Sequence, residues 1–270
     1  MEWRNIYRGL LMGASDVVPG VSGGTIAVVL GIYDRLIEAI NGFFSKEYKK
    51  HLMFLIPLGI GILTAIFLLA GVIEWLFEHY PKQTQFAFLG LIIGVLPFLL
   101  QKSEAKRTFK PKHIFMTFLG ICLVGSMIFF QTGEPEPVID FTMSTYLWLF
   151  GSGFIASSAM ILPGISGSFL LYVIGSYTTI ISAIKNLDIM IILIVGIGIF
   201  LGILIMSKVI HYFLETFPTA TYAVVIGMVI GSVFVIFPGF PTNISGTVVC
   251  VISFAGGLLF AYLLGRVEYR

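Results

Sequence analysis

Six stretches of mainly apolar residues, each roughly 20 residues long, constrain this chain more than any other feature. They lie at residues 52–77, 84–101, 114–131, 188–212, 222–238 and 246–264. A stretch of this length and composition is typical of an α-helix that crosses a bilayer. Only 11% of the residues are charged, against about 25% in soluble domains. We therefore expect an all-α polytopic membrane protein folded as a single membrane domain.

Two further apolar regions, residues 9–40 and 145–184, are each interrupted in the middle. Proline and paired glycines end a helix, and a following serine or threonine can cap a new one. The residues expected to form the two turns are Pro19, Gly20, Pro163 and Gly164. The residues expected to cap the new helices are Ser22, Thr25, Ser166 or Ser168. Each region is thus predicted to be a broken helical element.

The two broken regions repeat each other at an offset of 144 residues, with 11 identical positions and no gap between 9–40 and its copy. The identities include Pro19 with Pro163 and Gly31 with Gly175. The match continues at an offset of 137, where Gly90 faces Gly227. The chain therefore divides into a first repeat, 1–133, and a second repeat, 144–270, each consisting of one broken element followed by three spans. The glycine spacings Gly90/Gly94, Gly198/Gly202 and Gly227/Gly231 are expected to serve helix packing.

The basic residues predict how the two repeats are oriented. If each broken element enters the membrane and returns to its own side, 13 of the 16 Lys and Arg residues fall on one face. If each element crosses instead, the split is 9 against 6. The positive-inside rule favours the first arrangement, with both termini cytoplasmic. Because three spans separate the two re-entrant elements, they enter from opposite faces, and the repeats are expected to be inverted.

The lengths of the broken elements agree with this topology. A helix from Thr25 to Asp34 would be about 15 Å long, half of a hydrocarbon core of about 30 Å. The second element is apolar for longer, from Phe169 to Ile184. A full helical hairpin therefore stays open as an alternative for the second element.

Irregular backbone at membrane depth must be buried in protein or line a polar cavity. Two such segments that meet from opposite sides therefore indicate a binding site. Amide groups, hydroxyls and helix N-termini suit a phosphate, and glycine lets an oxyanion approach the backbone closely. The candidate phosphate ligands are Ser22, Gly23, Gly24, Thr25, Ser166, Gly167 and Ser168. The alternative is that the breaks serve only close packing.

Four charged or titratable residues are further candidates. Asp16 lies three positions before Pro19, and an ionisable residue at this depth could bind a coupling proton or sodium ion, orient the turn or cap local amides. Arg35, Lys208 and His211 are candidates for secondary anion contacts. Solvation at the membrane interface and snorkelling are the simpler interpretations of these three.

Several classes of function are disfavoured. A net charge of +2 gives no basic face for nucleic acid. Cys122 and Cys250 lie in apolar stretches, so we expect core residues and neither a disulfide nor a metal site. The four histidines form no catalytic constellation. We therefore expect no catalytic residues, no metal and no cofactor apart from a coupling ion of unknown identity.

Residues 9–40 (GLLMGASDVVPGVSGGTIAVVLGIYDRLIEAI) and 158–177 (SAMILPGISGSFLLYVIGSY) resemble the two motifs of a bacterial and archaeal membrane family. This family, formerly a domain of unknown function, is now regarded as the PopT-type polyprenyl-phosphate transporters. The similarity covers essentially the whole chain. It implies a flippase that moves undecaprenyl phosphate across the cytoplasmic membrane, so that the lipid carrier is recycled for cell-envelope synthesis.

The partners implied by the resemblance are the polyprenyl-phosphate substrate and membrane lipids, with a homo-oligomer left open. Judged from the residues alone, an ion-coupled transporter of a small soluble anion is the alternative function. A membrane-embedded lipid phosphatase or transferase is less favoured, because clustered catalytic side chains are missing.

Overall fold

The computed structural model describes residues 2–16, 22–130 and 141–268. Within these ranges the regular structure is entirely helical, which confirms the all-α prediction. The first half contains α1 (Arg4–Asp16), α2 (Gly23–Val29), α3 (Tyr33–Asn41), η1 (Gly42–Phe44), α4 (Tyr48–His79), α5 (Pro81–Lys102), α6 (Ala105–Thr108), α7 (Pro111–Gly125) and η2 (Ser126–Phe130). The second half contains α8 (Met143–Met160), α9 (Gly167–Ile174), α10 (Tyr177–Lys185), α11 (Ile189–Thr216), α12 (Pro218–Ile236) and α13 (Ile244–Glu268).

Six of these helical segments are long and apolar enough to cross a membrane: α4, α5, α7 with η2, α11, α12 and α13. They coincide with the six predicted spans, and most of the observed helices extend a few residues beyond the predicted range at one or both ends. Large apolar side chains cover much of their outer surface, as Phe67 in α4 illustrates at 81% exposure. Such a surface is unfavourable in water and suits contact with acyl chains. The protein is therefore a multi-pass membrane protein.

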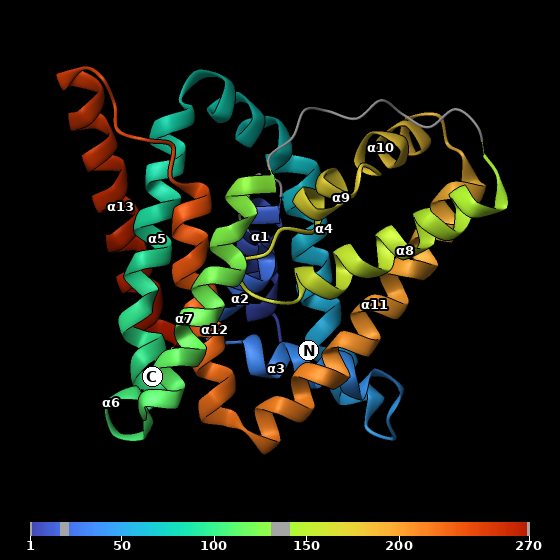
Figure 1. Cartoon of the computed structure of the whole chain (residues 1–270), viewed down its shortest axis with the longest axis horizontal. Coiled ribbons are helices and arrows are strands. Elements are labelled where there is room, and N and C mark those ends of the chain that lie inside the picture. The colour runs from blue at the N-terminus through green and yellow to red at the C-terminus, as the bar shows by residue number, and fades with distance from the viewer. Residues whose placement is uncertain (1, 17–21, 131–140, 269–270) are drawn as a thin grey trace.

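The helices pack in two groups, which Figure 1 shows on the left and right of the molecule. In the left group, α5 packs along α13, α7 packs along α12, and α12 also contacts α5. In the right group, α1 packs along α4, α8 packs along α11, and α3 lies against both α4 and α11. Each group combines helices from both halves of the sequence.

Glycines allow the four closest helix pairs to approach each other. A Cβ atom on Gly61 would lie 2.1 Å from a carbonyl oxygen of α1, and one on Gly198 would lie 2.3 Å from a carbonyl oxygen of α8. A Cβ atom on Gly90 would lie 2.0 Å from a carbonyl oxygen of α13, and one on Gly227 would lie 2.1 Å from a carbonyl oxygen of α7. Side chains at these positions would force the helices apart. The packing role predicted for Gly90, Gly198 and Gly227 is confirmed.

The direction of the packed helices defines the path of each broken element. Gly9 of α1 faces Gly61 of α4, and Gly13 faces Ala65, so α1 and α4 run parallel. The chain between them must therefore return to the end at which α1 began. In Figure 1, α1 rises from the N-terminus and α3 lies near the lower end, which also carries the C-terminus and α6. We call this end of the molecule the lower end.

Both broken elements contain a second break that the sequence interpretation missed. α2 ends at Val29 and α3 begins at Tyr33, so the predicted continuous helix from Thr25 to Asp34 is wrong. The cause is Gly31, which takes a left-handed backbone conformation with φ of +66°. Its repeat partner Gly175 has φ of +87°, and there α9 and α10 meet at 108°. The second element is therefore also bent within its apolar run, between α9 and α10.

The two cysteines of the chain are both free. Cys250 is buried, as expected, but Cys122 is exposed, so the prediction of a core position is wrong for Cys122. α7 turns Gly120 toward α12. Two residues further on, a helical side chain points to the opposite face. Cys122 therefore lies on the outer side of α7.

Candidate functional site

The two motif turns, far apart in the sequence, contact each other. The Gly164 amide donates a hydrogen bond of 2.7 Å to Thr25 Oγ1, across 139 residues of sequence. Ser22 Oγ donates to the Met160 carbonyl oxygen at 3.4 Å. A Cβ atom on Gly24 would lie 3.0 Å from that carbonyl oxygen, so glycine permits the close approach. The prediction that the two broken elements meet is confirmed for the described residues.

Serine side chains cap the helices that follow both turns. Ser22 Oγ accepts a hydrogen bond from the Gly24 amide at 3.1 Å, and Ser166 Oγ accepts one from the Phe169 amide at 3.5 Å. Ser166 also shares a hydrogen bond of 2.9 Å with Ser168 Oγ. Ser22 and Ser166 are therefore the caps, whereas Thr25 and Ser168 lie within the first turn of their helices.

Most candidate phosphate ligands lie in the interior. Ser22 and Thr25 are each 1% exposed and Ser166 is 6% exposed, and Gly23, Gly24 and Gly167 are also buried, whereas Ser168 is exposed. Backbone amides and hydroxyls are thus concentrated in a buried region with little water, where an unpaired polar group is costly. Protein atoms accept hydrogen bonds from several of these donors, as Ser22 Oγ does from the Gly24 amide and Thr25 Oγ1 does from the Gly164 amide.

The second turn is fixed by its backbone and by α12. Gly164 has φ of +87°, and a Cβ atom there would lie 2.6 Å from the Met228 carbonyl oxygen in α12. Ile165 packs with Met228 and with Val124 of α7. Pro163 and Gly164 therefore form the predicted turn. Pro19 and Gly20, the predicted turn-forming residues of the first element, lie outside the described residues.

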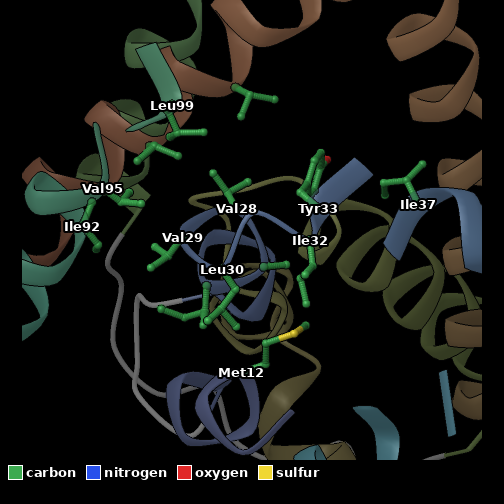
Figure 2. Packing of buried hydrophobic residues seen from close by; sticks show 14 of the residues in the cluster. Met12, Val28, Val29, Leu30, Ile32, Tyr33, Ile37, Ile92, Val95 and Leu99 are labelled. Carbon is green, nitrogen blue, oxygen red and sulfur yellow. The ribbon is translucent and has the colours of Figure 1, made fainter. Parts of the chain in front are cut away.

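The first turn is held against the left group through α2. Figure 2 shows the apolar side chains that follow the turn packed opposite side chains of α5. All of these side chains are almost fully buried. The α2 side of this contact includes Val28 and Val29, and the α5 side includes Ile92, Val95 and Leu99. One turn is thus anchored on α5 and the other on α12.

Asp16, at the end of α1, binds the first motif directly. Its Oδ1 atom accepts a hydrogen bond from the Gly23 amide at 2.7 Å. A Cβ atom on Gly23 would lie 2.7 Å from both carboxylate oxygens, so glycine is also needed for this contact. The carboxylate therefore occupies an amide that an anionic ligand could otherwise use.

The three predicted secondary anion contacts are not gathered at the turns. Arg35 forms an ion pair with Glu2 and lies over the Phe54 ring, 5.0 Å from its centroid. His211 Nε2 lies 3.3 Å from Glu215 Oε1 one helical turn away, and Lys208 is exposed on α11. Among the contacts of the described residues, none joins these three side chains to the motif turns.

A second polar cluster was not anticipated from the sequence. Lys102 Nζ at the end of α5 lies 2.7 Å from Asp34 Oδ2 in α3, and the Tyr222 hydroxyl of α12 donates to the same oxygen at 2.5 Å. The partners of Asp34 are far away in the sequence and share no motif with it. One sequence without covariation therefore carries no signal that pairs them.

In the part of the chain that the structure describes, no group of three or more His, Cys, Asp or Glu side chains could hold a metal ion. The arrangement instead offers hydroxyl and amide donors from two turns, inside a bundle of membrane-spanning helices. The fold and these turns define a multi-pass helical membrane protein whose interior suits an anionic group.

The undecaprenyl phosphate translocase-like family model matches residues 12–249, and the chain belongs to this family. A polyprenyl-phosphate transporter of Staphylococcus aureus is 43% identical over 274 residues, covering 98% of this chain and 97% of the relative. A polyprenyl-phosphate transporter of Vibrio cholerae is 36% identical over 252 residues, covering 88% and 79%. No solved structure matches the chain. The family assignment is that of a transporter and not of an enzyme.

Proposed function

We propose that this protein transports polyprenyl phosphate, such as undecaprenyl phosphate, across the bacterial cytoplasmic membrane for recycling of the lipid carrier. The family assignment and the names of two relatives support this substrate. The observation that carries the proposal on structural grounds is the contact between the two motif turns, through the Gly164 amide and Thr25 Oγ1. A head group bound there would contact both halves of the chain.

The phosphate binds to hydroxyls and amides of both turns. The proposed ligands are Ser22, Gly23, Gly24, Thr25, Ser166, Gly167 and Ser168. α2 has seven residues and α9 has eight, so the proposal rests on individual hydrogen-bond donors and not on long helix dipoles. Hydrogen bonds to a charged oxyanion are about twice as strong as bonds between neutral groups. A phosphate is therefore a better acceptor for these donors than the neutral carbonyl and hydroxyl oxygens that accept their hydrogen bonds in the described structure.

Asp16 acts in release or coupling. Its carboxylate holds the Gly23 amide at 2.7 Å, so a phosphate that takes this amide must displace it. Two anions at one donor repel each other strongly where water is excluded. Asp16 therefore competes with the substrate, and its return to Gly23 favours release. A proton or a sodium ion bound to Asp16 would remove this competition and couple transport to an ion gradient.

The two halves of the chain form inverted repeats. The supporting observation is that the packing contacts come in matched pairs. Gly61 and Gly198 are repeat partners that mediate the α1/α4 and α8/α11 contacts, and Gly90 and Gly227 are partners that mediate the α5/α13 and α7/α12 contacts. α8 and α11 also run parallel, as α1 and α4 do, because Gly198 faces Phe150 and Gly202 faces Phe154. Such a pair of repeats supports alternating access around a central site.

The lower end of the molecule faces the cytoplasm, and both broken elements are re-entrant. Both termini and α6 lie at the lower end in Figure 1. α6 carries Lys106 and Arg107, and Lys102 lies just before it. The positive-inside rule supports a cytoplasmic location for such an end. The apolar tail of the substrate stays in the acyl-chain region while the head group passes between the left and right groups.

Transport of lipid by the purified protein tests this function. Vesicles carry polyprenyl phosphate in the outer leaflet, and an added phosphatase reports which head groups remain accessible. We expect protein-dependent protection of the head group, and we expect Ser22→Leu and Ser166→Leu to abolish it. Ser207→Ala is the matched control, because Ser207 is buried in α11 and donates to Leu204 O in its own helix.

Two results would contradict the proposal. Unchanged transport in both leucine variants would show that the turns do not bind the substrate. Uptake of labelled inorganic phosphate or carboxylates with no movement of lipid would favour the soluble-anion alternative.

A further inference from the structure

The Asp34 cluster is built around a single anionic oxygen. Lys102 Nζ and the Tyr222 hydroxyl both contact Asp34 Oδ2, at 2.7 Å and 2.5 Å. Lys102 Nζ also lies 5.7 Å from the centroid of the Tyr222 ring. The two donors belong to the left group, through α5 and α12, whereas Asp34 belongs to α3 of the right group. An ammonium group and a phenol that converge on one oxygen are typical ligands of a phosphate oxygen.

The carboxylate satisfies this cluster only in part. Among the described residues, Asp34 Oδ1 and the Tyr33 hydroxyl are buried and have no hydrogen-bond partner. Tyr33 is 3% exposed, and in Figure 2 its hydroxyl points away from Leu30 and Met12. A buried hydroxyl without a partner is unfavourable. A phosphate group has three terminal oxygens, so it could accept hydrogen bonds from both Lys102 and Tyr222 and still accept one from a further donor.

The cluster is partly exposed, and it follows the first motif turn closely along the chain. The side chains of Lys102 and Asp34 are 30% and 40% exposed. α3 follows α2 after three residues, so the element that carries the first motif turn leads directly to Asp34. In the proposed transport, a head group that leaves the turns toward the lower end would pass close to α3 and this cluster.

We infer that Lys102 and Tyr222 form a second binding station for the phosphate head group at the lower end, and that Asp34 occupies this station when no substrate is bound. This inference rests on the proposed function. The arriving phosphate takes the two donors from Asp34, whose carboxylate turns to water. The exchange also breaks the link between α3 and the left group, so the lower end opens as the substrate leaves.

Binding measurements with substitutions of opposite expected sign test the station. The probe is a short-chain polyprenyl phosphate, titrated calorimetrically into the purified full-length protein in detergent at constant ionic strength. Measurements in a Ser22→Leu background isolate the lower station from the central turns. We expect Lys102→Gln to weaken binding about tenfold, as for the loss of one charge-assisted hydrogen bond. We expect Asp34→Asn to tighten binding about threefold, since the competing charge is partly exposed and screened.

Matched variants separate binding from a general effect of charge or folding. Lys112→Gln removes an exposed positive charge near the lower end and should leave affinity unchanged, whereas Lys102→Arg should retain binding. Thermal unfolding of each variant checks that it is folded. Inorganic phosphate alone should compete poorly, because the inferred ligand is a lipid head group.

The station is overturned if Lys102→Gln and Asp34→Asn change the affinity in the same direction, as a purely structural ion pair predicts. It is also overturned, with the proposed function intact, if the wild-type protein binds the probe and Lys102→Gln has no effect in the Ser22→Leu background. Failure of the wild-type protein to bind any polyprenyl phosphate overturns both.

Discussion

Replacement of Thr25 by valine removes the contact between the two motif turns with little change of shape. Thr25 is 1% exposed, and Gly164, whose amide donates to Thr25 Oγ1 at 2.7 Å, is also buried. Valine leaves this amide without its acceptor in a region that excludes water. The cost of such an unpaired group is about 1–3 kcal/mol. We expect Thr25→Val to lower the free energy of unfolding by that amount and to reduce lipid transport.

The assay is graded denaturation of the purified protein in mixed micelles, together with the vesicle assay of head-group accessibility. Thr25→Ser keeps the acceptor oxygen and should retain most of the stability and transport. Thr64→Val is the matched control, because Thr64 Oγ1 donates at 2.7 Å to Ile60 O in its own helix. If Thr25→Val is no less stable than Thr64→Val and transports lipid normally, the turn contact does not organise the site.

Three further predictions concern the competing carboxylate, the helix crossings and the topology. Asp16→Asn keeps an acceptor for the Gly23 amide but removes the charge that competes with the phosphate. The substrate should then bind more tightly and leave more slowly, so KM and kcat for lipid transport should both fall. Unchanged values of KM and kcat would exclude competition by Asp16. Gly227→Ala should lower the free energy of unfolding by about 1–3 kcal/mol, because the new Cβ would lie 2.1 Å from a carbonyl oxygen of α7. The control is Gly196→Ala, whose Cβ would have no atom within 4 Å, and which should be neutral or stabilising in the same denaturation assay. In a cysteine-free background, Lys185→Cys should react with an impermeant maleimide added to intact cells and Lys46→Cys should not; the reverse labelling would invert the proposed orientation.

The spans could be predicted from the sequence because bilayer thickness sets the length of an apolar helix. The meeting of the turns could be predicted because three spans separate two similar broken elements. The glycine crossings followed from spacings such as Gly90 with Gly94 and Gly227 with Gly231. In each case a repeated pattern within one sequence carried the information.

Other features depend on contacts that no local pattern encodes. The break at Gly31 is a single glycine in an apolar run, and an isolated glycine is often tolerated within a helix. Hydropathy does not reveal which face of a membrane helix contacts lipid, because lipid and protein interiors are similarly apolar. Cys122 was misassigned for that reason. The Asp34 cluster joins three helices through two charged residues and a tyrosine, each of which, taken singly, suggests only a position at the membrane interface.

In the proposed mechanism, the two motif turns bind one phosphate head group between them. The most direct test is an experimental structure of the protein with bound polyprenyl phosphate. We expect phosphate density within hydrogen-bonding distance of both Ser22–Thr25 and Ser166–Ser168, with the Asp16 carboxylate displaced from the Gly23 amide. A head group bound elsewhere, with the contact between Thr25 and Gly164 unchanged and the Asp16 carboxylate still on Gly23, would contradict it.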